Sequence, residues 1–397
     1  MLDSEKWYVI HHMDKMNPFL MSIVSSHDHW LFVSSTGGLT AGRVSPETAL
    51  FPYITDDKLH DCTSHTGSKT VLRVRSQQWE PFNQAHEGRY DITRNLYKNF
   101  LGNKLLFEEI NHTLQLRFRY VWMSSAQYGF VRQSELKNLS HEQVTVGVFD
   151  GLQNILPAGT PRHSQASTSN LVDAYKWAEL DEVSGLAIFS LFSGISDRAE
   201  PLESLKATTV FSLGLNDPKL LLSSDQLQQY SAGQPIESER HKRGIRGEFF
   251  VNATLNIAPD NASSWQIVAD VEQTQNEVIK LRKELINLPE ISESIALSVK
   301  SGSDKLARIM ASADSFQETE EQTLTAHHYA NVLFNVLRGG VFEEQYLVPS
   351  RDFETTIASF NRKTYERQKG FLRSLPDTMS FSSLTCAISE LNFLQLE

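Results

Sequence analysis

The sequence contains only two cysteines, Cys62 and Cys386, and they lie far apart. Two isolated thiols do not form the disulfide framework of a small secreted domain, and their spacing matches no metal site. The N-terminus also lacks a basic segment followed by an apolar run, so it does not read as a signal peptide. We therefore expect a cytoplasmic protein in a reducing compartment.

Long apolar runs and an excess of basic residues are also missing. No segment reaches the roughly 18 consecutive apolar residues that a membrane-spanning helix needs, and the formal net charge is −11. The single basic cluster, residues 240–246, is interpreted as a solvated loop. We therefore expect neither membrane nor nucleic acid as a partner. With 397 residues, the chain is long enough to bury a sizeable core.

The first two thirds of the chain alternates apolar and polar residues. In residues 113–122, every second side chain from Leu114 to Trp122 is apolar, whereas Arg117 and Arg119 lie on the opposite face. The same alternation is found in residues 69–76, 143–150 and 248–257. A period of two predicts strands with one buried face. Because no helices separate these strands, the pattern favours an antiparallel β-sandwich over a doubly wound α/β fold.

The period changes after Trp265. Apolar residues from Val271 to Leu288 recur at intervals typical of one helix face, and Pro289 is expected to end that helix. Further helices are predicted around residues 329–337, 351–375 and 382–396. The sequence thus predicts a mainly β protein with α: a β domain over residues 1–270 and a helical region over residues 271–397.

The stretch SSTGGLTAGR, residues 34–43, is rich in glycine and ends on Arg43. A phosphate-binding P-loop would need a lysine and a hydroxyl residue after the last glycine, but Arg43 and Val44 stand there. A dinucleotide-binding fingerprint would need different glycine spacing and a βαβ unit. We therefore expect a tight turn that leads from a strand into a long irregular loop over residues 37–57.

Four side chains of this loop have the chemistry of a sugar site. Tyr53 offers an aromatic face to sugar C–H groups, and Arg43, Asp56 and Asp57 can bind adjacent hydroxyls. The alternative is a structural loop in which Arg43 pairs with one of the two aspartates. Both interpretations stay open at the level of sequence.

A second group of sugar-binding candidates follows the strand predicted over residues 113–122. Gln127 and Tyr128, with Trp122 and Arg132, could form a sugar platform. Trp122 also continues the apolar face of the preceding strand, which favours a place in the core.

Two other segments carry polar residues with a chemical interpretation. Asp150 and Gly151 are expected to form a turn out of a strand, and Asn154 is a candidate to line a cleft. Glu109, with His112 nearby in sequence, could act as the base of a mutarotase-like reaction. The alternative for Glu109 is a polar strand rim.

Three long stretches resemble a known group of proteins. Residues 17–61, 95–132 and 148–159, the last reading VFDGLQNILPAG, resemble the N-terminal part of large bacterial carbohydrate-active enzymes related to cellobiose and chitobiose phosphorylases. In that inverting group, a β-supersandwich of the galactose-mutarotase type is followed by a helical linker and an (α/α)6 catalytic barrel. The resemblance implies a sandwich over residues 1–270 and a linker over residues 271–397.

The same resemblance implies where catalysis takes place. The group's catalytic acid and phosphate site lie in the barrel, so no catalytic residue is carried onto this chain. The implied partners are an oligosaccharide, the α/α-barrel catalytic domain and a second copy in a homodimer. No cofactor or metal is expected, and inorganic phosphate is a co-substrate only of the parent enzyme. Residues 37–57 would help to cover the glycan site.

Three functions follow. The first is the non-catalytic N-terminal portion of a glycoside phosphorylase or hydrolase, which shapes and covers a glycan site. The second is a stand-alone carbohydrate-binding or scaffold protein. The third is a mutarotase- or epimerase-like enzyme that uses Glu109. We expect the chain alone neither to cleave nor to phosphorolyse oligosaccharides.

Overall fold

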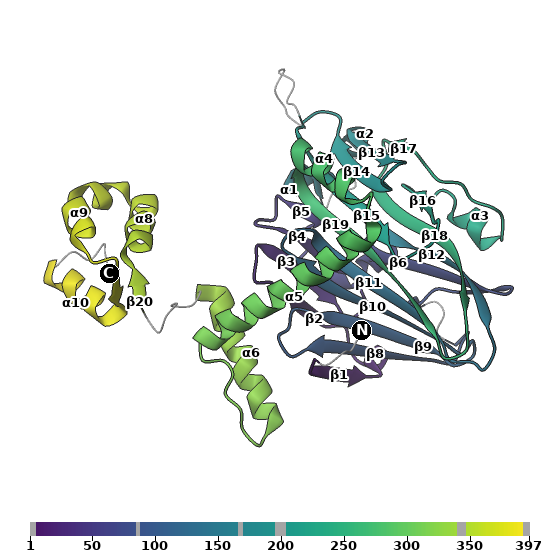
Figure 1. Cartoon of the computed structure of the whole chain (residues 1–397), viewed down its shortest axis with the longest axis horizontal. Helices are drawn as coiled ribbons and strands as arrows, with labels where there is room; N and C mark the ends of the chain where they lie inside the picture. The colour runs from purple at the N-terminus through teal and green to yellow at the C-terminus, as the bar shows by residue number, and fades with distance from the viewer. Residues whose placement is uncertain (1–4, 85–87, 166–169, 195–203, 340–346, 392–397) are drawn as a thin grey trace. The chain divides into compact units, whose positions relative to one another are not determined.

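The computed structural model describes residues 5–84, 88–165, 170–194, 204–339 and 347–391. The chain forms two compact units, Met1–Ser303 and Asp304–Glu397. The first unit consists of β-sheets with helices packed on them, and the second is helical apart from a short two-stranded ribbon (Figure 1).

The largest sheet of the first unit is antiparallel, in the order β1-β8-β9-β10-β11-β19-β15-β14-β13-β17. Its strands are Trp7–His11 (β1), Ile92–Asn99 (β8), Leu105–Asn111 (β9), Leu116–Ser125 (β10), Gly129–Asn138 (β11), Lys176–Asp181 (β13), Leu186–Leu191 (β14), Lys206–Leu213 (β15), His241–Arg243 (β17) and Ala262–Thr274 (β19). Strands β8 to β11 follow one another as hairpins, and β19 then joins β11 from much later in the chain.

Two smaller antiparallel sheets complete the sandwich. One has the order β16-β18-β12-β6-β7 and the other β2-β3-β4-β5. Their strands are Leu20–Ile23 (β2), His29–Ser34 (β3), Leu39–Arg43 (β4), Ala49–Phe51 (β5), Gly67–Val74 (β6), Gln77–Trp79 (β7), Val144–Ile155 (β12), Lys219–Leu221 (β16) and Gly247–Ile257 (β18). The fold is therefore mainly antiparallel β, as the alternation predicts.

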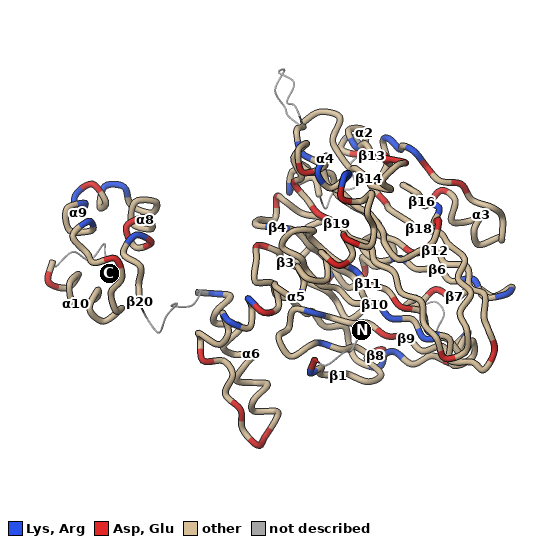
Figure 2. The backbone as a smooth tube through the Cα atoms, viewed as in Figure 1, with Lys and Arg blue, Asp and Glu red and all other residues tan. Residues whose placement is uncertain are grey.

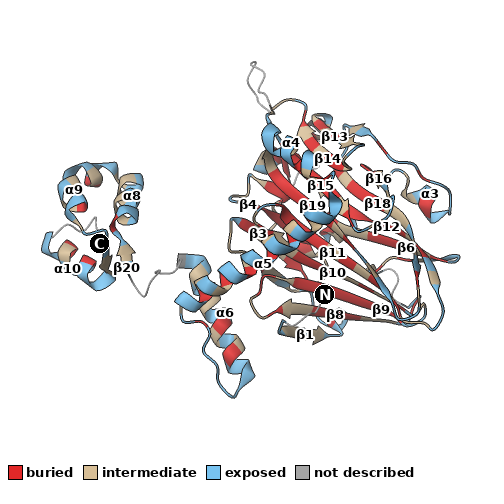
Figure 3. Cartoon of the chain, viewed as in Figure 1, coloured by how far each residue is buried: buried red, intermediate tan, exposed pale blue. Residues whose placement is uncertain are grey.

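The main core lies between the facing sheets and is built from the alternating residues. Leu116, Phe118, Tyr120 and Trp122 of β10 all enter it, so Trp122 is a core residue. Alternate residues of β6, β12 and β18 meet them from the opposite sheet. Figure 3 shows the buried segments concentrated on these strands.

One ion pair crosses this core. Arg132 of β11 donates from Nη1 to both carboxylate oxygens of Asp150 of β12, at 2.9 and 2.8 Å, and neither residue is exposed. Thr70 Oγ1 and Trp265 Nε1 donate to the same carboxylate at 2.6 Å each. Asp150 thus lies within a strand and joins the two sheets, so the expected turn at Asp150 is wrong. Arg132 is likewise committed to this pair and is not part of a surface platform.

Short helices connect strands of the sandwich, and two longer helices cover the outer face of its large sheet. The short elements are Met13–Lys15 (η1), Asp57–His60 (η2), Cys62–Ser64 (η3), Arg162–Gln165 (α1), Asn170–Ala174 (α2) and Leu227–Ser231 (α3). The longer helices α4 (Gln275–Glu284) and α5 (Leu288–Ser312) place Leu281, Ile291 and Ile295 against β11, β15 and β19.

The change from strands to helices falls at Thr274. Val271 belongs to β19 and enters the main core, so its expected place on a helix is wrong. Pro289 stands in the first turn of α5, where a missing N–H costs nothing, and does not end a helix. Residue 270 therefore lies inside β19, four residues before this strand ends. The compact unit continues to Ser303, because α4 and α5 pack on the sheet.

The second unit contains the end of α5 and four further helices within the described residues. These are Gln322–Gly339 (α6), Ser350–Phe360 (α8), Arg362–Ser374 (α9) and Phe381–Leu391 (α10), with the ribbon Leu347–Pro349 (β20) and Thr378–Ser380 (β21). The helix expected over residues 351–375 is interrupted at Asn361, whose side chain caps α9. Residues 392–396 of the last predicted helix lie outside the described residues. No helix among the described residues is long and apolar enough to cross a membrane.

The buried pair gives the first prediction. Asp150→Asn should lower the free energy of unfolding by about 3 to 5 kcal/mol, because it leaves the Arg132 charge uncompensated inside the core. Lys206→Gln is the matched control, since it breaks an exposed pair with Glu272 and should cost less than about 1 kcal/mol. Urea denaturation of both variants measures the difference, and equal small losses would contradict the role of the pair.

Candidate functional site

A cavity of about 310 Å³ opens between the sheets of the first unit. Tyr120 of β10 lines it from the large sheet, and residues 68–70 of β6 line it from the five-stranded sheet. The β3–β4 turn at residues 36–37, the short helices η2 and η3, and residues 80–84 after β7 complete the lining. Donors and acceptors therefore converge on one space from separate elements.

Tyr120 presents its hydroxyl to this cavity from the core. The residue is 3% exposed, and no hydrogen bond of its hydroxyl is recorded within the described residues. Its ring lies over the Arg132 guanidinium, 4.8 Å from the ring centroid. Burial raises the pKa of the Tyr120 hydroxyl well above its ordinary value, so it stays protonated and can donate. Gly37 leaves room there, because a Cβ at that position would lie 3.5 Å from the Tyr120 oxygen.

Phe82 forms an aromatic wall of the cavity. Its backbone has a φ of 65°, a conformation that is strained for a bulky residue. The Phe82 N–H donates to Glu109 Oε2 at 2.6 Å, and the ring meets Tyr120 edge-to-face at 5.3 Å. The segment that carries Phe82 is thus held in place by a buried carboxylate.

Glu109 has this structural role instead of a free catalytic one. It is 1% exposed and also accepts from Trp79 Nε1 and Arg94 Nε, both at 2.7 Å. Arg94 Nη2 in turn donates to the Asn83 carbonyl at 3.1 Å. Three donors surround the carboxylate, and Glu109 does not line the cavity. The geometry makes it a positioning residue for residues 80–84.

Charged and hydroxyl groups occupy the remaining walls. Lys69 and Glu80 form an ion pair whose side chains are 19% and 15% exposed. His60 Nδ1 lies 2.6 Å from Ser34 Oγ, and Thr36 Oγ1 donates to the His60 carbonyl at 2.8 Å. Among the residues that the structure describes, no three His, Cys, Asp or Glu side chains are grouped to hold a metal ion.

Arg43 lies outside this cavity, at the end of β4. Its Nη1 donates to both oxygens of Asp270 at 3.1 Å, and its Nε and Nη2 donate to Asp28 Oδ1 at 3.1 and 2.9 Å. The predicted carboxylate partner is therefore present, but its identity was predicted wrongly, because Asp56 and Asp57 are not its partners. The expected irregular loop over residues 37–57 is also wrong, since it contains β4 and β5.

The other candidates of residues 37–57 lie apart from Arg43. Tyr53 is half-buried, packs edge-to-face on Trp30 at 5.3 Å and lies under the Arg162 guanidinium at 5.1 Å. Asp56 is exposed and caps η2 by accepting from the Lys58 N–H, and Asp57 is exposed in the first turn of η2. Neither aspartate lines the cavity, although η2 itself does through His60.

The remaining candidates have structural contacts. Tyr128 is 6% exposed and packs among α4 and α5, with its hydroxyl 3.4 Å from Glu284 Oε2. Gln127 Nε2 donates to that hydroxyl at 3.1 Å. Asn154 stands at an irregularity of β12 with a φ of 58° and donates to Thr66 Oγ1 at 2.9 Å. Gln127 and Tyr128 thus contact each other, whereas Asn154 contacts Thr66, and the binding roles of all three stay predictions.

Sequence reasoning missed the residues that do meet in the cavity. Tyr120 looks like one more core residue of an alternating strand, and only the three-dimensional structure shows that its hydroxyl faces a cavity. Lys69 lies in β6 and Glu80 directly after β7, so the sequence alone does not show that they pair. The one sequence signal was the predicted turn at Gly37, which does form part of the lining.

Comparisons with known proteins give structural neighbours alone. No protein-family model matches the chain, and no curated protein matches it in sequence. Similar solved structures include a putative kojibiose phosphorylase from human microbiome (9% identity, TM-score 0.37, covering 67% of this chain and 32% of that one). A bacterial glucoamylase complexed with acarbose is 10% identical (TM-score 0.41, covering 77% and 41%). A putative aldose 1-epimerase from Klebsiella pneumoniae is 7% identical (TM-score 0.33, covering 72% and 96%).

A glycoside phosphorylase and an aldose epimerase are therefore among the structural neighbours, and the sequence resemblance names a phosphorylase group and a sandwich of the mutarotase type. The matched region spans about a third of the phosphorylase and two fifths of the glucoamylase. TM-scores below 0.5 carry no argument about activity, so the function has to come from the residues of this chain.

The Arg43 contacts give the second prediction. Burial raises the pKa of Asp270 to about 6, while Arg43 opposes the shift. A carboxyl whose pKa rises on folding stabilises the protein below its unfolded pKa of about 3.9, and this contribution is lost as the pH rises through 6. Arg43→Gln should therefore cost about 2 to 4 kcal/mol at pH 7.5 and clearly less at pH 5.

Urea denaturation at the two pH values tests this prediction. Combining Arg43→Gln with Asp270→Asn should remove the difference between the two pH values, because no buried carboxyl is then left unpaired. A loss that is the same at pH 5 and pH 7.5 in the single variant would show that Arg43 does not compensate the Asp270 charge.

Proposed function

We propose that the first unit is a carbohydrate-binding unit, and that its cavity holds one sugar residue of an oligosaccharide. The observation that carries the proposal is the Tyr120 hydroxyl, which has no recorded hydrogen bond within the described part of the chain and is aimed from the core into a space lined by an aromatic wall and polar groups. A volume of about 310 Å³ lies at the lower end of the range of small-molecule sites. Sugars combine C–H faces that pack on rings with hydroxyls that need oriented partners.

The proposed role is binding without bond cleavage. A mutarotase-like or hydrolytic reaction needs a free acid and a free base within reach of one sugar. Glu109 is held by Trp79, Phe82 and Arg94, and Glu80, one of the carboxylates that line the cavity, is paired with Lys69. Asp61 also lines the cavity and is exposed, so these contacts support a recognition site more than a matched acid and base.

A wider setting for this unit is also proposed, on the sequence resemblance alone. In this setting the chain is the non-catalytic N-terminal portion of a cytoplasmic glycoside phosphorylase or hydrolase. Its partners are then an α/α-barrel catalytic domain and a second copy, with inorganic phosphate as the co-substrate for phosphorolysis. Arg43, Tyr53, Asp56 and Asp57 lie outside the cavity and are candidates for the interface with the barrel.

The third prediction concerns the Tyr120 hydroxyl. Tyr120→Phe should weaken oligosaccharide binding about tenfold, the value of one hydrogen bond of roughly 1.4 kcal/mol, and leave the melting temperature unchanged. Isothermal titration calorimetry with cellotetraose and chitotetraose measures the effect. We expect the unmodified chain to bind at least one of them and to release no products, with or without phosphate.

Tyr8→Phe is the matched control. It also removes a tyrosine hydroxyl that has no hydrogen-bond partner among the described residues, but Tyr8 lies on the edge strand β1 and does not line the cavity. Equal affinity of both variants for the glycan, or absence of binding by the unmodified chain, would overturn the proposal.

A further inference from the structure

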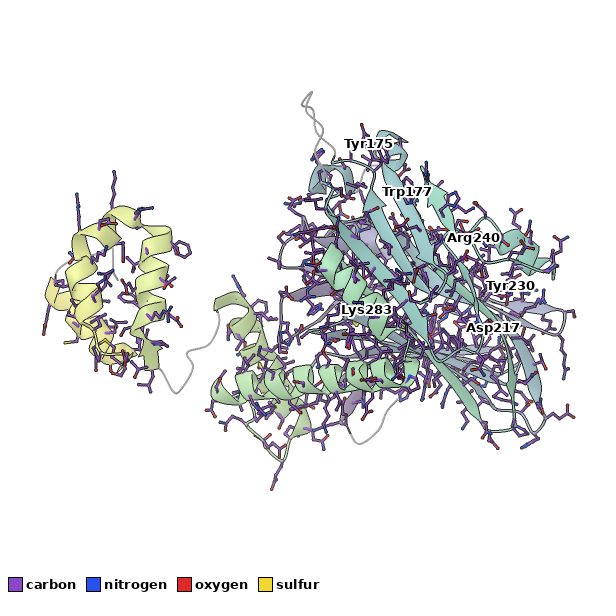
Figure 4. The ribbon with its side chains drawn as sticks, turned by 45° about the horizontal axis from the view of Figure 1, so that its top comes forward. Tyr175, Trp177, Asp217, Tyr230, Arg240 and Lys283 are labelled. Atoms are coloured by element: carbon purple, nitrogen blue, oxygen red, sulfur yellow. The ribbon has the colours of Figure 1, made fainter. Side chains whose placement is uncertain are left out.

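A second cluster of polar and aromatic groups lies on the outer face of the large sheet, at the edge formed by β14, β13 and β17. Figure 4 labels Tyr175, Trp177 and Arg240 in this part of the molecule. Trp177 faces Arg243 in the strand register, and the Arg243 guanidinium lies 3.6 Å from the centre of the indole ring. Phe192 stacks parallel to Trp177, with ring centroids 6.3 Å apart and an interplanar angle of 5°.

Phe192 and Arg243 are exposed to solvent, whereas Trp177 is half-buried. Ala178, the next residue of β13, enters the main core, so Trp177 points to the outer face. Helices α4 and α5 cover that face over β11, β14, β15 and β19, but their apolar cluster contains no residue of β13 or β17. Phe192 is 75% exposed, and its N–H donates to the Tyr175 carbonyl at 2.8 Å. The stack is therefore fixed by the backbone, although it is open to solvent.

The basic residues around the stack differ in whether an acidic partner is recorded for them. Arg240 is paired with Glu182, and Lys242 is paired with Asp225 and Glu239. Arg243 is exposed, and no acidic partner is recorded for it among the described residues. Its guanidinium face is occupied by Trp177, so its N–H edge is the part available to a ligand. Figure 2 shows basic and acidic residues interspersed along this edge.

We propose that Phe192, Trp177 and Arg243 form a second glycan subsite, specific for an oligosaccharide that carries carboxylates, such as a uronic acid chain. The exposed Phe192 ring packs on the C–H face of one pyranose. The Arg243 edge binds a sugar carboxylate through two parallel hydrogen bonds. This inference rests on the proposed function only in taking sugars as the ligand class, because its residues are separate from the Tyr120 cavity.

An acidic group shares this face. Glu179, two residues along β13 from Trp177, is exposed and lies opposite His241 in the register, so the anion is expected at Arg243 and not at that end of β13. The cations at 240 and 242 already have acidic partners, so the anion would be bound by Arg243. A neutral sugar would use the rings and leave the guanidinium edge unsatisfied.

Titration calorimetry with the full chain tests the subsite. The probes are an α-1,4-linked hexagalacturonate and the same hexamer with every carboxyl methyl-esterified. We expect submillimolar binding of the acid, weakened at least about tenfold by Arg243→Gln and weakened further by added salt. Phe192→Ala should weaken binding of both probes, and, because the side chain is exposed, its melting temperature should not change.

Arg240→Gln is the matched control, since it removes a nearby cation that is already paired, and it should bind the acid like the unmodified chain. No binding of the acid at about 5 mM, equal binding of acid and ester, or an Arg243→Gln variant that binds unchanged would each overturn the inference. Tyr120→Phe should leave this binding intact, so failure of the cavity proposal and failure of this one give different results.

Discussion

The first unit depends on the ion pair between Arg132 and Asp150. Arg132 comes from the ten-stranded sheet and Asp150 from the five-stranded sheet that faces it, so the pair links the two sheets. Thr70 and Trp265 donate further hydrogen bonds to the Asp150 carboxylate. A pair that is fully removed from water contributes geometry more than net stability, because desolvation offsets most of the Coulombic attraction. The pair therefore sets the relative position of β11 and β12 and holds it there.

The candidate cavity is built directly on this pair. Tyr120 packs on the Arg132 guanidinium, and Thr70 both lines the cavity and donates to Asp150. A second buried carboxylate, Glu109, holds the strained Phe82 segment that forms the wall. The site is thus supported by charged contacts that lie beneath it and do not touch a ligand. Groups that are already held in place lose little conformational entropy of their own when a sugar binds.

The sequence predicted the local features well and the long-range contacts poorly. Alternation in residues 113–122 gave the core face of β10, because strand faces follow from the order of side chains alone. The partners of Arg43 were missed because Asp270 lies 227 residues away in the chain. Asp150 was interpreted as a turn residue because polar residues rarely occupy strand interiors, and only the opposite sheet supplies its counter-ion. The left-handed backbone of Phe82 leaves no signal in the sequence.

The central claim is that a sugar residue binds in the cavity over Tyr120. A crystal structure of the chain after soaking with an oligosaccharide tests this claim most directly. The account predicts a pyranose in the space between β10 and β6, with one of its oxygens within about 3 Å of the Tyr120 hydroxyl. A glycan that occupies another surface at saturation, while this cavity stays empty, would contradict the account.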